Sequence, residues 1–148
     1  MANQTKIIYD KLGSILKGMF QGGVPVHYDS IFRNRETPYF NIMPLSNSFM
    51  QARIGSGETR ELTFEIKYYK LDSSDTGKDV LDDITEKVEQ VKSEINNHRG
   101  FDPSADAPWT QALVTSVEYH AQDELSEEEQ EIKDLLVAII TIQIIGDV

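Results

Sequence analysis

The stretch that decides the fold is DELSEEEQEIKDLLVAIITIQII, which runs from Asp123 to Ile145. Seven carboxylates lie between Asp123 and Asp134, and the uncharged run that follows, from Leu135 to Ile145, has eleven residues. A helix that spans a membrane needs roughly 20 apolar residues, so this run is too short to cross one. We therefore expect a strand that other parts of a protein cover.

Both sides of this expected strand are apolar. Alternate side chains of a strand point to opposite faces of a sheet. One side would carry Leu136, Ala138, Ile140, Ile142 and Ile144, and the other Leu135, Val137, Ile139 and Ile145 together with the polar Thr141 and Gln143. A central strand beneath two helices is one explanation. If both helices lie on one face, loops or a neighbouring subunit must cover the other face. The sequence leaves both arrangements open.

Composition indicates a single domain, residues 1–148. The chain has 148 residues, of which 39% are hydrophobic, and this is enough to bury a core. It has no cysteine, which excludes disulfides and thiolate metal sites and fits a reducing cytoplasm. Its first residues lack the pattern of a signal peptide. With 14 basic and 25 acidic residues the net charge is −11, which argues against tight nucleic-acid binding.

Two segments have the spacing of amphipathic helices. The first, residues 3–20, carries apolar residues three or four positions apart and precedes a pair of glycines. The second lies within residues 73–100 and follows several candidate capping residues. Its apolar positions are Val80, Ile84, Val88, Val91 and Ile95, and Gly100 follows them as a stop signal.

Several other segments are predicted strands. The clearest is RELTFEIKYYK, residues 60–70, in which apolar and polar side chains alternate. SFMQA, residues 48–52, is predicted to be its hairpin partner, with the glycine-rich tip between them. Further strands are predicted at VPVHY (24–28), PYFNIM (38–43) and WTQALVTSVEYHA (109–121). Strands that cluster between helices predict an α+β fold, with a largely antiparallel sheet, two main helices packed on it and a terminal apolar strand.

No pattern in the chain indicates catalysis. IGSGETR, residues 54–60, lacks the spacing of a phosphate-binding loop and precedes a strand, so we interpret it as a hairpin tip. His27, His98 and His120 do not have the spacing of a metal site, and no serine lies in a nucleophile elbow. We predict no catalytic, cofactor-binding or metal-binding residues and no enzyme activity. The acidic run is either a solvated loop or an acidic surface with a function.

The lengths of these segments and their order along the chain resemble those of a known protein family. The segments are a short N-terminal helix, PYFNIMPL (38–45), TRELTFEIKYYKLD (59–72), the acidic helix LDDITEKVEQVKSEI (81–95), WTQALVTSVEYHAQDE (109–124) and LLVAIITIQII (135–145). Together they resemble the tail terminator, or tail completion, proteins of long-tailed bacteriophages. The likeness covers nearly the whole chain and includes no diagnostic catalytic or ligand motif.

The resemblance implies a small α+β subunit that forms a hexameric ring on the end of the completed tail tube. Such a ring stops tube polymerisation and presents a surface to the neck or connector of the DNA-filled head. The implied partners are other copies of the chain, the tail tube protein and a neck or connector protein, while DNA passes without tight binding. The implied location is the tail or neck of the virion, after assembly in the host cytoplasm.

Two groups of residues are candidate contact sites under this interpretation. The hypothesised interface residues are Arg53, Ser56 and Arg60 near the hairpin tip, and Ile140 and Ile142 in the terminal strand; the loop 100–108 is a further contact element. The hypothesised acidic surface or channel lining consists of Glu127, Glu128, Glu129 and Glu131, because a ring would repeat each carboxylate around a passage to which DNA does not adhere. Solvated arginines and a solvated acidic loop are the alternatives.

Two other functions stay open on the sequence alone. A head-closure or neck protein also forms a ring but contacts the portal side. An unrelated acidic binding module that forms oligomers through its terminal strand is the second alternative. A small enzyme that uses carboxylates has no nucleophile, metal set or phosphate loop to support it.

Overall fold

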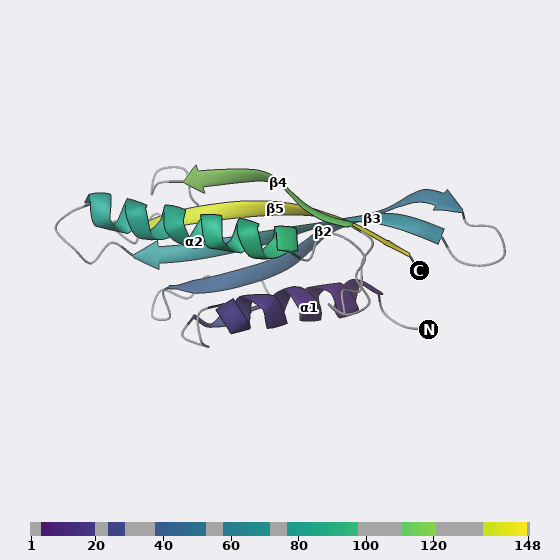
Figure 1. Ribbon diagram of the computed structural model, residues 1–148, viewed down its shortest axis with the longest axis horizontal. Helices are drawn as coiled ribbons and strands as arrows, with labels where there is room; N and C mark the ends of the chain where they lie inside the picture. The colour runs from purple at the N-terminus through teal and green to yellow at the C-terminus, as the bar shows by residue number, and fades with distance from the viewer. Residues whose placement is uncertain are drawn as a thin grey trace.

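The structure is a computed structural model, drawn in Figure 1, that describes residues 4–19, 24–28, 38–52, 58–71, 77–97, 111–120 and 135–147. The elements in this part of the chain are α1 (Gln4–Met19), β1 (Val26–His27), β2 (Tyr39–Ala52), β3 (Glu58–Leu71), α2 (Gly77–Asn97), β4 (Gln111–His120) and β5 (Leu135–Asp147). The predicted α+β class is confirmed, because both helices pack on a mostly antiparallel sheet. Within these ranges neither helix is long and apolar enough to cross a membrane.

The apolar terminal strand lies inside the sheet. The strand order is β1-β2-β3-β5-β4, so β5 has β3 on one side and β4 on the other. Its antiparallel pairing with β3 runs without interruption from Leu71↔Leu135 to Thr59↔Asp147, whereas β1 pairs with β2 in parallel. A strand between two neighbours has its backbone groups paired on both sides, and apolar residues on both faces suit such an interior position.

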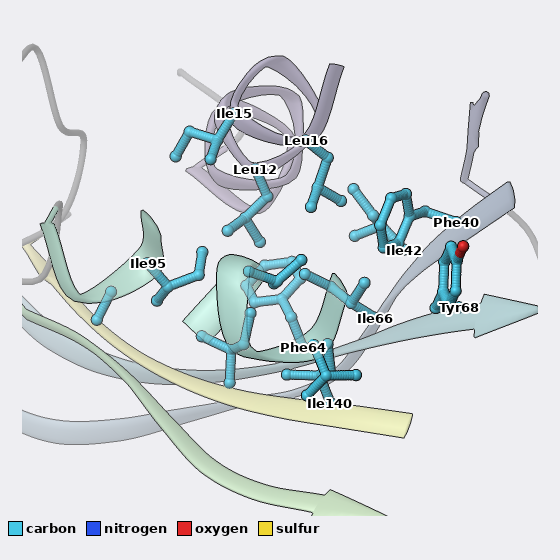
Figure 2. Packing of buried hydrophobic residues seen from close by; sticks show 14 of the residues in the cluster. Leu12, Ile15, Leu16, Phe40, Ile42, Phe64, Ile66, Tyr68, Ile95 and Ile140 are labelled. Carbon is cyan, nitrogen blue, oxygen red and sulfur yellow. The ribbon is translucent and has the colours of Figure 1, made fainter. Parts of the chain in front are cut away.

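One face of the sheet and the inner sides of both helices form the core. Its buried members include Ile8, Leu12 and Leu16 of α1, Ile84, Val88, Val91 and Ile95 of α2, and Phe40, Ile42, Leu62, Phe64, Ile66, Tyr68, Ala138, Ile140, Ile142 and Ile144 of the strands. Figure 2 shows Leu12 and Leu16 directed from α1 toward the sheet. Burial of each such side chain contributes about 1.5–3 kcal/mol, so the predicted helical and alternating patterns mark the residues that stabilise the fold.

The second strand differs from the prediction. The sequence predicts separate strands at residues 38–43 and 48–52, but β2 runs through both from Tyr39 to Ala52. Its register with β3 shifts between Pro44 and Ser46. A bulge of this kind accommodates a proline, which has no N–H for the ladder, without ending the strand.

A polar cluster fixes α2 on the sheet. The Tyr68 hydroxyl on β3 donates a hydrogen bond to Asp83 Oδ2 on α2 at 3.2 Å, and Lys70 Nζ lies 3.6 Å from the same oxygen. Lys87 Nζ, one turn along the helix, lies 3.5 Å from Asp83 Oδ1. Burial of the ring, together with the nearby Asp83 carboxylate, raises the pKa of Tyr68 well above its usual value. Tyr68 therefore stays a neutral donor across the ordinary pH range.

Helix α1 meets the residue that follows β1. A Cβ placed on Gly13 would lie 1.9 Å from the Tyr28 hydroxyl oxygen, so only glycine permits this approach. The Tyr28 and Tyr9 ring centroids are 5.6 Å apart, and Lys17 Nζ lies 5.6 Å from the Tyr28 centroid. These contacts hold the end of β1 against α1.

Candidate assembly surface

Both helices lie on one side of the sheet, and the opposite side, here called the second face, has no helix over it in the described part of the chain (Figures 1 and 2). Alternation along the two central strands assigns to it Glu61, Thr63, Glu65, Lys67 and Tyr69 of β3 and Val137, Ile139, Thr141, Gln143 and Ile145 of β5. Of the two arrangements that the sequence leaves open, the structure has the one in which helices cover a single face.

One end of the second face is packed within the subunit. Tyr39, Asn41, Tyr69 and Val137 are at most 2% exposed. The Tyr39 and Tyr69 rings stack with 4.8 Å between centroids, and the His27 ring approaches Tyr39 edge-on at 5.6 Å. The side-chain amide atoms of Asn41 are buried without a hydrogen-bond partner, which costs about 1–3 kcal/mol. This end is therefore core rather than a contact surface.

The rest of the second face is partly exposed and mixes apolar with polar side chains. Ile139 and Ile145 of β5 are half-buried, and Thr141 and Gln143 lie between them on the same face. The Gln143 amide donates a hydrogen bond to the Glu61 carboxylate on the adjacent strand. Such a mixture of apolar area and hydrogen-bonding groups is common to protein surfaces in general, including those that form non-obligate interfaces.

The β2–β3 hairpin projects beyond the ends of both helices (Figure 1). The predicted contact residue Arg60 lies on β3 in this projecting part, and its Nε donates a hydrogen bond to Asn47 Oδ1 on β2. This bond links the guanidinium to the neighbouring strand of the hairpin. Arg53 and Ser56, the other two contact residues predicted near the hairpin, lie outside the described residues.

Ile140 and Ile142, the two interface candidates in the terminal strand, lie in the core. Both side chains are 0% exposed and belong to the core cluster beneath the helices. The alternation of β5 directs them to the helix-covered face, so contact between this strand and a neighbour must come from the second-face residues.

The four glutamates of the proposed acidic surface, Glu127, Glu128, Glu129 and Glu131, lie outside the described residues, and so does the loop 100–108. The structure describes no group of three or more His, Asp or Glu side chains that is arranged to hold a metal ion. The acidic-surface hypothesis thus rests on the sequence.

A cleft of about 370 Å³ lies between the C-terminal parts of the two helices, lined by Lys11, Ser14, Ile15, Gly18, Met19 and Glu94. Its volume is within the range of ligand pockets, but such pockets are mostly apolar and enclose their ligand. Here an amine, a hydroxyl and a carboxylate surround two apolar side chains. The Ser14 hydroxyl in this cleft donates its hydrogen bond to the Asp10 backbone carbonyl at 3.0 Å, and not to a general base.

Sequence reasoning missed one feature of the projecting hairpin. All fourteen residues of β2 are uncharged, in a chain of which 26% is charged, and Leu45 at its bulge is 52% exposed. The signal was present in the sequence, since no lysine, arginine, aspartate or glutamate occurs between Tyr39 and Ala52. It became meaningful only when β2 was seen to be a single strand near the edge of the sheet.

Comparison of the chain with protein families and with curated proteins finds no match. The geometry of the subunit and the resemblance in segment order are therefore the grounds on which a function is assigned.

Proposed function

We propose that the protein is a structural subunit of a long-tailed bacteriophage, which forms a ring, of six subunits in the family that it resembles, on the end of the tail tube. The ring stops tube polymerisation and joins the tail to the neck of the head. It acts through shape and contact and catalyses no reaction. The observation that carries the proposal is the packing of both helices on one face of the sheet, with a hairpin that projects beyond them.

This arrangement supports ring assembly because a ring needs two different contact surfaces on each subunit. A head-to-tail contact joins one surface of a subunit to another surface of the next, and it closes when the rotation is right. Strand β4 and the part of β2 that β1 does not cover lie at opposite sides of the sheet and are two such surfaces, and the hairpin that contains β2 projects beyond the helices.

The acidic character of the chain supports the part of the proposal that concerns DNA. Each subunit carries a net charge of −11, so a ring multiplies a negative field around its passage. Phosphates are repelled by that field, and DNA passes through without being held. This role is proposed for Glu127, Glu128, Glu129 and Glu131.

The test is to measure the mass of the purified protein in solution and then to image it with polymerising tail tube protein. Under the proposal, rings form and appear at one end of tubes, and the tubes stop growing when the ring protein is added. A ring that binds a portal or neck protein and ignores tubes would favour a head-closure role. Oligomers that bind neither would favour an unrelated binding module.

A charge reversal at the hairpin makes the test sharper. Arg60→Glu and Lys92→Glu both change the charge by the same amount, but Lys92 lies on α2, away from the hairpin, where it pairs with Glu89 at 3.3 Å. Exposed ion pairs contribute only about 0–1 kcal/mol, so both variants should fold. Tube capping is expected to fail with Arg60→Glu and to persist with Lys92→Glu. Equal capping by both variants would remove the hairpin from the proposed contact.

A further inference from the structure

Two strand edges of the sheet are open in the described part of the chain. Strand β1 pairs with β2 only at Phe40 and Asn41, and no described strand pairs with the rest of that edge. On the opposite side of the sheet, β4 pairs with β5 and has no described strand on its outer side. Open edges present unpaired N–H and C=O groups that a further strand can join.

The stretches of β2 and β4 that contain no bulge lie opposite each other across the sheet, at the same position along the strand direction. Bulges interrupt β2 between Pro44 and Ser46 and between Phe49 and Gln51, and β4 between Val114 and Ser116. Regular backbone therefore extends over residues 46–49 of β2 and 111–114 of β4.

The strand registers connect these two stretches directly. One row across the sheet runs Ser48↔Glu61↔Ile145↔Gln111, and another runs Ser46↔Thr63↔Gln143↔Leu113. The end residues of each row lie on the second face, because their row neighbours in β3 and β5 do.

The directions of the two edges also match. Each of the pairs β2–β3, β3–β5 and β5–β4 is antiparallel, so β2 and β4 run in opposite directions. When β4 of one copy is placed beside β2 of the next, the two strands are antiparallel and the helices of both copies stay on the same side. Because the joined rows are at one level, repetition of this contact gives a head-to-tail arrangement with little rise, which becomes a ring when the rotation between copies closes.

Charge favours a second copy as the occupant of this edge. Two subunits that each carry −11 repel each other, and they approach best where neither has charged groups. Strand β2 has no charged residue, and β4 has none from Gln111 to Val117. Natural sheet edges are usually protected by charged residues, lysine above all, and these two stretches lack that protection.

We propose that copies of the chain join by antiparallel pairing of β4 residues 111–114 with β2 residues 46–49 of the next copy. The inference deepens the proposed function and rests on it, because it names the contact that builds the ring. Ser48 of one copy then faces Gln111 of the next, and Ser46 faces Leu113.

Cysteine cross-linking tests this contact cleanly, because the chain has no cysteine of its own. In the double variant Ser48→Cys/Gln111→Cys, the two positions of one chain are separated by three strand spacings, about 14 Å, so they cannot form a disulfide within a subunit. Oxidation is expected to give a ladder of covalent oligomers that ends at the full ring. The single variants Ser48→Cys and Gln111→Cys should remain monomeric on a denaturing gel.

Two further variants serve as matched controls. Ser48→Cys/Ser116→Cys places the second cysteine five residues along β4, about 15 Å from the proposed partner position, and should give no ladder. Ser48→Cys/Asn96→Cys places it on the exposed part of α2 and should give none either.

Several outcomes would overturn the pairing and leave the proposed function standing. Rings that form and cap tubes without a Ser48–Gln111 ladder would show that another surface joins the subunits. Covalent dimers of Ser48→Cys alone would indicate a two-fold contact between β2 strands. Conversely, a ladder from a protein that never caps tubes supports the pairing and contradicts the proposed function.

Discussion

At the scale of single residues, Gly13 leaves room for the Tyr28 side chain because glycine has no Cβ. In most helix positions Gly→Ala stabilises a helix by about 1 kcal/mol. At Gly13 the added methyl group would collide with Tyr28, which must then leave Tyr9 and lose a ring contact of about 0.5–1.5 kcal/mol. We expect Gly13→Ala to stabilise the protein in a Tyr28→Ala background and not in the wild type, measured by urea unfolding.

Gly18 is the matched control for this prediction. It lies in the same helix, and a Cβ placed on it would have no neighbour within 4 Å. Gly18→Ala should therefore have the same effect on the free energy of unfolding whether Tyr28 is present or not. If Gly13→Ala also behaves identically in both backgrounds, the proposed collision does not occur.

Tyr68 is expected to lower the free energy of unfolding at alkaline pH. Its folded-state pKa is raised by burial and by Asp83, so in the unfolded chain the hydroxyl loses its proton at a lower pH than in the folded protein. The stabilisation is complete below the unfolded pKa of about 10 and is lost as pH rises toward the folded value. The free energy of unfolding should therefore fall as pH rises above about 10, by at most about 1.4 kcal/mol per pH unit from this group.

Tyr68→Phe separates this effect from general alkaline denaturation. The variant should lose about 1 kcal/mol at neutral pH, because the hydrogen bond to Asp83 is absent. Its further loss between pH 10 and 11 should be smaller than that of the wild type. Asp83→Asn should lie between the two, since burial remains when the carboxylate is gone. If the free energy of unfolding falls equally steeply with pH in all three proteins, the titration of Tyr68 is not the cause of the alkaline loss.

At the scale of elements, β5 is the strand on which the fold depends, and adjacent residues test its two faces. Ile142 is 0% exposed in the core, whereas Thr141 is partly exposed on the second face. Ile142→Asp would bury a carboxylate that has no partner, and deletion of the isoleucine alone costs about 2–5 kcal/mol. Because domains are stable by about 5–15 kcal/mol, we expect this variant to be largely unfolded by circular dichroism.

Thr141→Asn is the control for that prediction and should fold, because an uncharged side chain avoids repulsion from Glu65, the residue opposite Thr141 on β3. Its side chain reaches solvent, and surface substitutions usually change stability by about 0.5 kcal/mol or less. If Ile142→Asp gives a soluble protein with a wild-type unfolding curve, β5 does not occupy the centre of the sheet.

At the scale of the whole molecule, substitutions in the acidic segment test whether the proposed ring repels DNA. Exchange of Glu127, Glu128, Glu129 and Glu131 for glutamine removes four negative charges per chain and preserves side-chain size. Under the proposed function, rings should still form and cap tubes. They should also retain DNA at low salt and release it as salt rises, because the repulsion of phosphates is weaker.

Measurement of DNA retention and tube capping on one preparation separates the alternatives. A variant that caps tubes and retains no DNA at any salt concentration would contradict the channel hypothesis and indicate a solvated loop. Loss of capping without a change in DNA retention would indicate that the segment binds a basic surface on a tail or neck partner.

The sequence by itself determined the local elements and the composition of the core. Periodic apolar positions such as Leu12, Val88 and Phe64 predicted two helices and the clearest strand, because burial selects apolar side chains at helical or alternating spacing. The eleven-residue apolar run predicted a covered strand for the same reason.

Only the tertiary structure decided what depends on contacts between distant segments. It placed β5 between β3 and β4, put both helices on one face, and made β2 continuous through Pro44. It also decided that Ile140 and Ile142 lie on the helix-covered face, because the face toward which a strand's alternate residues point depends on where the helices pack. Strand order and the level of the open edges arise from long-range pairing, which local spacing does not encode.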